Sequence, residues 1–297
     1  MTSKKVLLLG GEGQLGLSLQ AEKATIRAAG FELAPFNSTE VDITAQDSLA
    51  AVFEQVRPIC VVNAAAYTAV DKAEEETNKA YAVNGTAVKS ITMLCNQYKS
   101  RLIHISTDFV FDGVHSTPYK PDDVANPVNL YGQSKRLGEV EALAAEKHLV
   151  LRTGWLYAER GRNFLQTMLG LMASKSSLTV VADQIGTPTS AKGFARFIVG
   201  ALSGEQSGIY HWGDAGSASW YDFAVAIQEE AVALGMLEKE IAITPIASEQ
   251  YPTPAKRPNY SVLDKQKTWS DFDIRPIHWR KELRSILQAM NNNKKGD

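Results

Sequence analysis

The sequence has few cysteines, almost no excess charge and no long apolar run, and each absence excludes a class of protein. Cys60 and Cys95 are the two cysteines among 297 residues, and they lack the spacing of a thiolate metal site. We expect both to be buried, reduced thiols that pack as small apolar side chains. The net charge is only −2, whereas nucleic-acid-binding proteins carry a basic excess, so the expected ligand is a small molecule.

No apolar run is long enough to cross a membrane. The first run, residues 6–9, is too short even for the apolar part of a signal peptide. We therefore expect a cytoplasmic protein without a membrane partner. Apolar residues make up 44% and charged residues 22% of the chain, which is typical of a globular protein with a full core.

Short apolar runs alternate with longer helical patterns in the first half of the chain. Strands are expected at residues 6–9, 31–34, 59–62, 102–105 and 149–151, and helices at residues 14–29, 45–55 and 73–98. Strands that are apolar on both faces and separated by helices form a parallel sheet that is covered on both sides. The expected fold class is therefore α/β, with a Rossmann-type doubly wound parallel sheet.

The pattern changes beyond about residue 155. Helices are expected at residues 163–174, 191–203, 220–234 and 279–290, a strand at residues 208–211 and a frayed polar tail at residues 291–297. Three prolines exclude residues 251–258 from helices and central strands. We expect a dinucleotide-binding domain over residues 1–152 and a smaller, interleaved α/β substrate lobe over residues 153–297, parts of which return to the first domain.

A glycine-rich turn follows the first strand. Gly10, Gly13 and Gly16 give a Gly-x-x-Gly-x-x-Gly spacing, and Gly11, Gly13 and Gly16 fit the alternative Gly-x-Gly-x-x-Gly spacing. Glycine allows positive φ and lets the backbone approach a pyrophosphate, which the amino end of the next helix attracts. Between a first strand and a first helix this pattern predicts a dinucleotide site; the alternative is a turn without a ligand.

The end of the second strand leaves the choice of cofactor open. An acid there usually holds the ribose 2′-hydroxyl of NAD, and an arginine accommodates the 2′-phosphate of NADP. Residues 33–39 contain neither, so NADH and NADPH both stay open, and we favour NADPH or the use of both. Asp42 and Ile43 could lie against the adenine, although Asp42 could equally cap the helix at residues 45–55.

A Tyr-x-x-x-Lys pair, Tyr131 and Lys135, begins a helix after the fourth strand. Positions four apart share one face of a helix, so the phenol and the ammonium should point the same way. A neighbouring cation lowers the pKa of a tyrosine and makes the phenol a usable proton donor or acceptor. The spacing also arises by chance on exposed helices, but its place after the fourth strand of a dinucleotide fold favours a catalytic role.

Thr107 lies just after the end of the fourth strand, at the edge where open α/β sheets bind ligands. We expect its hydroxyl to hydrogen-bond a substrate carbonyl beside Tyr131. The alternative for Ser106 and Thr107 is a structural role as cap or turn residues.

Together these motifs resemble the extended short-chain dehydrogenase/reductase family, and within it the members that complete dTDP-L-rhamnose synthesis. The resemblance spans about residues 4 to 290 and is carried by residues 13–16, 62–74, 106–113, 127–135, 151–157, 163–164, 183–189, 208–211 and 253–258. The segments at residues 63–74 and 253–258 are far more specific than the glycine turn.

The resemblance implies the reduction of carbon 4 of dTDP-4-dehydro-β-L-rhamnose by a hydride from NADPH or NADH. Tyr131 would donate the proton to the developing alkoxide, and Thr107 would hydrogen-bond the reacting oxygen. Lys135 would lower the pKa of Tyr131 and hold the nicotinamide ribose. Asp108 and Trp155 would contact the sugar.

The resemblance also implies which residues contact the cofactor. They are Gly10, Gly13, Gln14, Leu15 and Gly16 at the pyrophosphate, Asp42 and Ile43 at the adenosine, Ala64, Ala65, Ala66, Tyr67 and Thr68 along the middle, and Ile105, Tyr131 and Lys135 at the nicotinamide side. Arg257, in the proline-rich segment, is the candidate for the nucleotide diphosphate, because a guanidinium binds phosphate bidentately. Lys256 is the second candidate for the diphosphate. The alternative for Arg257 is a structural role as a surface residue in a stiff loop.

Two departures from the family bear on these expectations. Phe109 stands where bacterial members often have tyrosine; the ring is kept, so the chemistry should not change. Some members dimerise around a magnesium ion held by acidic side chains, whereas the matching neighbourhoods here contain Ser18 and Lys192. Because a lysine repels a cation, we expect no metal-bridged dimer, while a homodimer of another kind stays open.

Two other functions fit the same motifs. One is another nucleotide-sugar reductase or epimerase of the family, acting on a GDP- or UDP-linked sugar, because residues 155–190 and 250–260 would set the substrate choice. The other is a non-catalytic regulatory subunit like that of methionine adenosyltransferase, which keeps cofactor binding. The complete set of Thr107, Tyr131 and Lys135 favours an enzyme.

Overall fold

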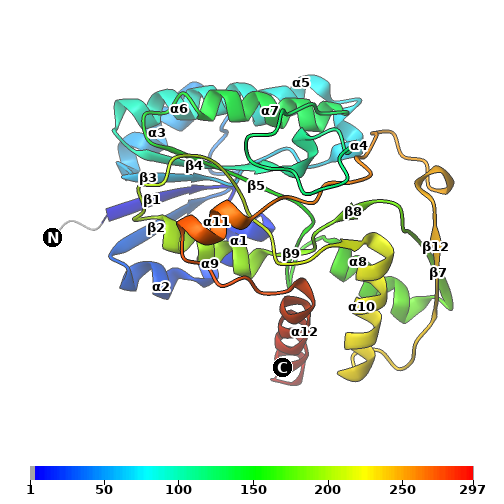
Figure 1. Ribbon diagram of the computed structural model, residues 1–297. Helices are drawn as coiled ribbons and strands as arrows, with labels where there is room; N and C mark the ends of the chain where they lie inside the picture. Colours follow the sequence, from blue (N-terminus) through cyan, green and yellow to red (C-terminus); the bar gives the residue numbers. More distant parts are fainter. Residues whose placement is uncertain (1–3, 297) are drawn as a thin grey trace.

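The computed structural model describes residues 4–296, and its centre is a parallel sheet of six strands (Figure 1). The strands are β1 (Lys4–Leu9), β2 (Phe31–Phe36), β3 (Cys60–Asn63), β4 (Arg101–Thr107), β5 (His148–Thr153) and β10 (Gly208–His211), in the order β10-β5-β4-β3-β1-β2. Every neighbouring pair is parallel. The expected α/β fold with a doubly wound parallel sheet is confirmed, together with all the predicted strands.

The chain reverses its winding direction at β1. This strand pairs with β2 on one side and with β3 on the other, so that Leu9 lies opposite both Phe36 and Asn63. In open α/β sheets such a switch point leaves a crevice outside the carboxyl ends of the strands, where ligands bind. The site described below lies at this edge of the sheet.

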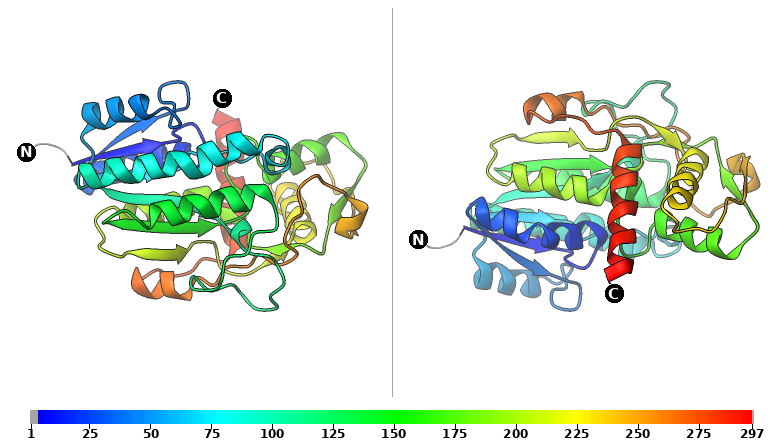
Figure 2. Two further views of the ribbon diagram at one scale, coloured as in Figure 1. Left: turned by 90° about the horizontal axis from the view of Figure 1, so that it is seen from above. Right: turned by 90° about the horizontal axis from the view of Figure 1, so that it is seen from below.

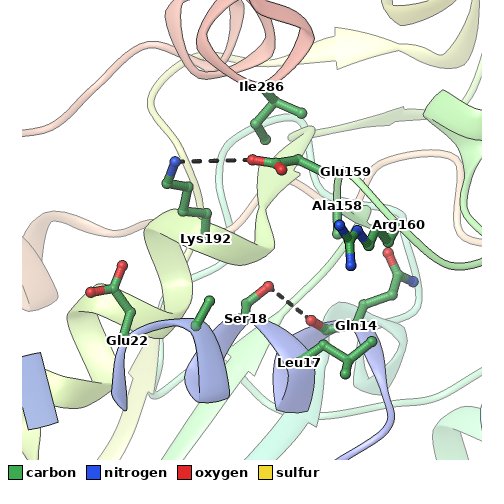
Figure 3. Close-up of a pocket in the computed structure, with 10 residues that line it drawn as sticks. Gln14, Leu17, Ser18, Glu22, Ala158, Glu159, Arg160, Lys192 and Ile286 are labelled. Carbon is green, nitrogen blue, oxygen red and sulfur yellow. Dashed lines mark hydrogen bonds and ion pairs between the residues drawn. The ribbon is translucent and has the colours of Figure 1, made fainter. Parts of the chain in front are cut away.

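Helices cover both faces of the sheet (Figure 2). One layer contains α3 (Gln46–Val56), α6 (Ala87–Gln97) and α7 (Leu130–Ala142), and the other contains α1 (Gln14–Ala21), α2 (Lys23–Ala28), α9 (Ala191–Ala201) and α11 (Gln266–Asp271). Helices α1 and α9 pack against each other, and Ser18 and Lys192 line a cavity beside them (Figure 3). Among residues 4–296, no helix is long and apolar enough to cross a lipid bilayer.

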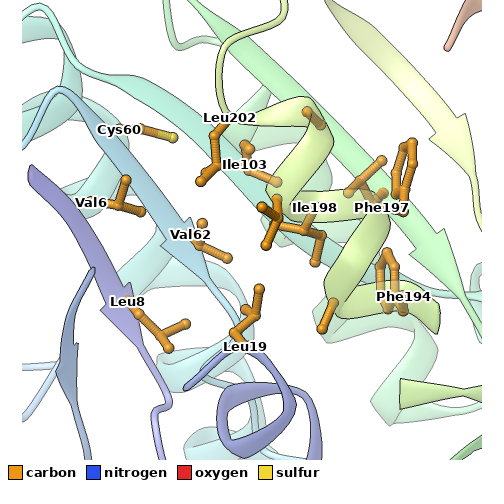
Figure 4. Close-up of a cluster of buried hydrophobic side chains, with 14 of the residues drawn as sticks. Val6, Leu8, Leu19, Cys60, Val62, Ile103, Phe194, Phe197, Ile198 and Leu202 are labelled. Atoms are coloured by element: carbon orange, nitrogen blue, oxygen red, sulfur yellow. The ribbon is translucent and has the colours of Figure 1, made fainter. Parts of the chain in front are cut away.

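Successive side chains of β1 enter the two apolar layers in turn, because side chains alternate along a strand. Val6 and Leu8 belong to the buried cluster under α1 and α9 (Figure 4), whereas Leu7 and Leu9 belong to the cluster under α3 and α6. Cys60 lies in the first cluster, and burial raises the pKa of its thiol to about 12. Both cysteines of the chain are buried and free, as expected.

A second lobe with its own apolar core lies beyond the carboxyl edge of the sheet (Figure 1). It is built from α8 (Phe164–Ser174), α10 (Trp220–Ala233), α12 (Trp279–Gly296), the parallel pair β7 (Ser177–Val181) and β12 (Ala242–Ile246), and the short pairs β6 (Leu156–Tyr157) with β9 (Thr189–Ser190) and β8 (Ile185–Gly186) with β11 (Ala218–Ser219). These strands were not predicted, because four of them have only two residues and the two longer ones, β7 and β12, are partly exposed. Between parts of this lobe the chain returns to the sheet as α9 and β10.

Two helix predictions were wrong in their extent. The helix predicted at residues 14–29 is broken at Glu22, and Leu19 and Ile26, on either side of the break, both belong to the core. The tail predicted to fray at residues 291–297 continues α12 as far as Gly296, and residue 297 lies outside the described residues. Asn291 anchors these turns, because its side-chain amide donates to the Leu234 carbonyl at 2.9 Å.

The helix predicted at residues 73–98 is also interrupted. The segment contains the end of α4 (Val70–Ala73), then α5 (Thr77–Tyr81), a π-helical turn (Ala82–Thr86) and α6. The π turn carries Asn84, whose side chain bonds to the backbone of Tyr67. Such single π turns inside α-helices occur frequently at functional sites.

A buried ion pair holds α7 against the sheet. The side chains of Glu139 on α7 and Arg152 on β5 are 0% and 1% exposed, and two hydrogen bonds of 2.7 and 2.9 Å join them. Ser106, near the end of β4, donates to Glu139 at 2.7 Å, and Arg136 donates at 2.8 Å. Burial works to raise the pKa of Glu139, but its bonds to Arg152 and the others outweigh burial and lower it, so the carboxylate is ionised.

Replacing Arg152 by methionine should lower the free energy of unfolding by about 3–5 kcal/mol, because it leaves the Glu139 charge buried without its main partner. The matched control is Arg136→Met, which removes a 35% exposed partner of the same carboxylate and should lower stability by less than about 1 kcal/mol. Urea titration measures both losses. Equal losses in the two variants would mean that the buried pair does not anchor α7.

Candidate functional site

The glycine turn lies at the switch point, between β1 and α1. Gly10 has a φ of 84°, and a Cβ on Gly16 would lie 2.2 Å from the Gly10 carbonyl oxygen. Glycine is therefore required at both positions for α1 to begin this close to the strand. Gly13 precedes α1 directly, and the free N–H groups at the start of a helix attract an anion. The structure thus favours the Gly10, Gly13 and Gly16 spacing.

A cavity of about 350 Å³ opens beside this turn, at the carboxyl ends of β1 and β2. The predicted cofactor residues that line it are Gly10, Gly13, Asp42, Ile43, Ala64, Ala65, Ala66 and Tyr67. Thr68 is exposed on the loop between β3 and α4, and Leu15 is buried beneath the turn. The volume and the helix end fit the adenosine diphosphate half of a dinucleotide.

Asp42 lines this cavity and does not cap α3. Its Oδ1 accepts hydrogen bonds from the hydroxyl and the backbone N–H of Thr44, at 2.6 and 2.9 Å, and these bonds lower the pKa of Asp42. Ala45 is the residue that precedes α3. Of the two roles left open for Asp42, the structure therefore retains the one that faces the cavity.

Gln14 faces the second lobe, which the sequence analysis missed. Its side-chain amide donates to the carbonyl of Arg162 at 3.4 Å, across 148 residues of sequence. Arg160 lines the same cavity as Gln14. The segment after β6 thus brings a cation close to the glycine turn.

Tyr131 and Thr107 meet at the carboxyl end of β4. Thr107 is the last residue of β4, Tyr131 is the second residue of α7, and the two hydroxyls lie within hydrogen-bonding reach. Thr107 also accepts the Phe109 N–H at 3.2 Å and so caps the 3-10 turn Asp108–Val110. The ring of Phe109 packs edge-on against Tyr131, with centroids 5.6 Å apart. The ring that Phe109 shares with the tyrosine of the family therefore packs against the phenol.

Lys135 lies one helical turn beyond Tyr131 and is 2% exposed. Its ammonium donates to the Ile105 carbonyl at 2.6 Å, two residues before Thr107. Burial lowers the pKa of Lys135 to about 8, and the nearby Glu139 carboxylate limits this shift. Tyr131, Lys135 and Glu139 thus form one buried stripe at four-residue spacing along α7.

The predicted effect of Lys135 on the phenol was wrong. Burial raises the pKa of Tyr131 to about 12, the Thr107 hydroxyl lowers it only in part, and Asp108 raises it further. The Lys135 ammonium is held by the Ile105 carbonyl instead. The phenol is therefore protonated at neutral pH, which is the form that donates a proton.

Asp108 lies behind Thr107 and is 2% exposed. Gly154 leaves room for its carboxylate, since a Cβ there would lie 2.4 Å from Asp108 Cγ. Burial raises the pKa of Asp108 to about 6 against hydrogen bonds from Ser261 and Thr107. Because Thr107 donates to it at 3.1 Å, Asp108 can act on a ligand through the Thr107 hydroxyl.

Asn84 is a buried residue of the site that the sequence analysis missed. Its side chain accepts the Tyr67 N–H at 2.8 Å and donates to the Tyr67 carbonyl and to Ser134, both at 3.0 Å. Ser134 donates in turn to the Tyr131 carbonyl at 2.8 Å. Asn84 therefore ties the cavity wall at Tyr67 to the helix of Tyr131, through a π turn that no sequence pattern indicated.

Trp155 stacks on Trp220, which lines a second cavity. It has a φ of 52°, which is strained for a bulky residue, and its ring stacks on Trp220 with centroids 3.4 Å apart. Trp220 was not predicted, because it joins Trp155 only through the fold of the lobe. Trp220, Phe164, Tyr251 and Arg257 line a groove of about 600 Å³ along α8 and β7.

Arg257 does line this groove, but its guanidinium is already paired. It donates to both oxygens of Asp71 on α4, at 3.1 and 2.9 Å, and its side chain is 24% exposed. The hydrogen bond from Arg257 lowers the pKa of Asp71. Asp71 thus orients the guanidinium, and the roles of diphosphate ligand and structural surface arginine both stay predictions.

The proline-rich segment lies over the amino end of α7. Asn129 caps this helix by accepting the Gly132 N–H at 2.7 Å, and its amide donates to the Lys256 carbonyl at 2.7 Å. The segment is thereby joined to the helix of Tyr131 as well as to α4. The loop that contains Arg257 of the groove thus also contacts the helix that carries Tyr131.

Ser18 and Lys192 lie in one cavity, as Figure 3 shows. Ser18 donates to the Gln14 carbonyl at 2.8 Å, and Lys192 pairs with Glu159 at 3.9 Å. Glu22, the other carboxylate there, pairs with Arg196 at 3.1 Å. This donor set does not fit magnesium, which needs uncommitted oxygen ligands. Among residues 4–296, no group of three or more His, Cys, Asp and Glu side chains could hold a metal ion.

Known proteins match this arrangement along nearly the whole chain. Spore coat polysaccharide biosynthesis protein SpsK of Bacillus subtilis is 40% identical, over 97% of this chain and 98% of its own. The dTDP-4-dehydrorhamnose reductase of Aggregatibacter actinomycetemcomitans is also 40% identical, over 95% of this chain and 98% of its own. The crystal structure of dTDP-4-dehydrorhamnose reductase from Bacillus anthracis in complex with NADP superposes with a TM-score of 0.91 at 30% identity, covering 97% and 100% of the two chains.

The family model described as "RmlD substrate binding domain" matches residues 4–292. Such a match includes the glycine turn, the Thr107–Tyr131–Lys135 cluster and the groove of the second lobe. With relatives of 40% identity aligned end to end, it follows that the chain belongs to the RmlD substrate binding domain family.

Proposed function

We propose that this chain is an NAD(P)H-dependent oxidoreductase that reduces dTDP-4-dehydro-β-L-rhamnose to dTDP-β-L-rhamnose. The observation that carries the proposal is the meeting of Thr107 and a protonated Tyr131 at the same sheet edge as the glycine turn. Relatives named dTDP-4-dehydrorhamnose reductase support the substrate. The intact cluster disfavours the non-catalytic alternative.

The bound cofactor would supply a hydride to carbon 4 of the sugar. Tyr131 would give its phenolic proton to the oxygen on that carbon. The Thr107 hydroxyl, which donates to Asp108 at 3.1 Å, would turn to donate to the same substrate oxygen. Both contacts strengthen as negative charge develops on the oxygen, which is the condition for catalysis. The Lys135 ammonium, held at the Ile105 carbonyl, would bind the nicotinamide ribose, and solvent would reprotonate the Tyr131 phenolate.

The groove of about 600 Å³ would bind the dTDP portion of the substrate. Its aromatic residues offer faces for stacking, and Arg257 offers N–H groups for the diphosphate. Trp155, stacked on Trp220, would contact the sugar between this groove and Tyr131. These contacts favour a nucleotide-activated sugar; the assignment of dTDP over GDP or UDP comes from the relatives.

The glycine turn and its cavity would make residues 1–152 the dinucleotide-binding domain, and the groove would make residues 153–297 mainly the substrate lobe. We propose that the protein acts in the cytoplasm. A homodimer, if formed, would be held without a metal bridge, because Lys192 and the paired carboxylates occupy that cavity.

Tyr131→Phe should bind the reduced cofactor normally but lose turnover by about 100- to 10,000-fold, the usual contribution of general acid catalysis. Turnover is measured with the dTDP-4-keto sugar, and binding by cofactor fluorescence. The control is Tyr81→Phe, which removes a phenol that bonds Gln133 at 3.1 Å outside the cluster and should keep full activity. Near-normal turnover of Tyr131→Phe would reject its role as proton donor.

The kcat/KM for reduction should fall as pH rises through about 8, because the pKa of Lys135 lies near 8 and its ammonium is the active form. In Lys135→Arg this fall should move to higher pH, since a guanidinium stays charged. Lys265 and Asp214 also have pKa values of about 8, owing to burial. A fall that stays near pH 8 in Lys135→Arg would assign it to one of them.

Arg257→Ala should raise the KM for the dTDP-sugar by roughly 10- to 100-fold, as hydrogen bonds to charged groups contribute about 1.5–3 kcal/mol. The matched control is Lys256→Ala, a neighbouring exposed cation, which should leave KM unchanged. An unchanged KM in Arg257→Ala, or an equal rise in Lys256→Ala, would place the diphosphate site elsewhere.

A further inference from the structure

The adenosine cavity contains a carboxylate that the second strand does not supply. In Rossmann folds an acid at the end of this strand holds the ribose 2′-hydroxyl, but β2 ends at Phe36 and is followed by the uncharged Asn37 and Ser38. Glu12 reaches the same place from the glycine turn. Its Oε1 accepts the Asn37 side-chain amide at 2.8 Å, and both residues line the cavity of about 350 Å³.

The orientation of Asn37 is set by its own hydrogen bonds. Its Oδ1 accepts the backbone N–H groups of Thr39 and Glu40, at 2.9 and 3.1 Å, and the Thr39 hydroxyl at 2.7 Å. Because the oxygen is committed to this turn, the amide nitrogen must face Glu12. The Glu12 carboxylate is therefore held beside the end of β2, although it comes from a different strand–helix connection.

The charges around this carboxylate do not suit a phosphate. Asp42 contributes a second carboxylate to the cavity wall, and Lys79 is the one cation among the lining residues. Lys79 lies away from the end of β2 in the sequence, over the Tyr67 ring at 5.7 Å from its centroid, and it pairs at the surface with Glu76 at 3.3 Å. A 2′-phosphate beside the end of β2 would thus meet the Glu12 carboxylate, without the arginine that usually accommodates it.

We infer that the Glu12–Asn37 pair selects the cofactor: the Glu12 carboxylate takes the role of the missing acid of β2, accepting the ribose 2′-hydroxyl, and it repels a 2′-phosphate. The enzyme therefore prefers NADH to NADPH. This inference rests on the proposed function and adds to it which nicotinamide the chain uses. It differs from the expectation based on residues 33–39, which favoured NADPH or both, because that segment does not include Glu12.

The test measures dissociation constants of NADH and NADPH by fluorescence titration of the purified chain, without substrate. The wild type should bind NADH at least about 10-fold more tightly, which corresponds to a discrimination of about 1.4 kcal/mol. Glu12→Gln keeps the size of the side chain and removes the charge, and should narrow the ratio to about threefold or less, mainly by tightening NADPH. Glu12→Arg should favour NADPH.

The matched control is Glu40→Gln. The Glu40 carboxylate accepts the Asn37 N–H at 2.9 Å in the same turn but is not part of the cavity wall, so its variant should keep the wild-type ratio. Tighter or equal NADPH binding by the wild type, or an unchanged ratio in Glu12→Gln, would overturn the inference and leave the proposed function intact. Failure to bind either cofactor would contradict both.

Discussion

The arrangement of this protein depends on one ion pair from which water is excluded, that of Glu139 and Arg152. The pair joins the middle of α7 to β5, and Ser106 extends it to β4. Glu139 lies on the same buried face of α7 as Tyr131 and Lys135. The ion pair that fixes Glu139 against the sheet therefore also fixes the position of Tyr131 and Lys135. A buried pair contributes little net stability over apolar packing, and its value here is that it allows one position of the helix.

The burial that positions these groups also sets their protonation. Tyr131 loses water and keeps its proton, with a pKa of about 12, while Lys135 loses water and is charged only below about pH 8. A protonated phenol is the form that can give a proton to the ketone oxygen, and the Lys135 ammonium is the form that can donate hydrogen bonds to the cofactor ribose. Desolvation in the crevice thus keeps Tyr131 protonated before a ligand binds.

The parts that could be predicted from the sequence are those set by local pattern. The strands of the central sheet could be predicted from apolar runs, and the glycine turn from its spacing. Tyr131 and Lys135 could be predicted from their spacing and their place after the fourth strand. The parts that escaped prediction depend on residues far apart in the chain. Asp71 meets Arg257 across 186 residues, and Asn84 meets Ser134 across 50 residues.

The direction of the Tyr131 pKa shift was predicted wrongly for the same reason, because it depends on contacts with residues far away in the sequence. Spacing alone places an ammonium next to the phenol, whereas the fold turns that ammonium to the Ile105 carbonyl and covers the phenol with Phe109. Glu12 belongs to this group as well, since its partner Asn37 lies 25 residues away on another connection. Contacts between residues of two different strand–helix connections depend on the order of the strands in the sheet. They can be identified only in the three-dimensional structure.

The most direct test of the account follows the hydride itself. Cofactor deuterated on the transferred position of its nicotinamide is incubated with the purified chain and the dTDP-4-keto sugar, which the preceding dehydratase and epimerase make in situ. The account predicts dTDP-L-rhamnose with one deuterium at carbon 4, identified by mass spectrometry and NMR. Deuterium at another carbon, or oxidation of the cofactor without a labelled dTDP-sugar, would contradict it.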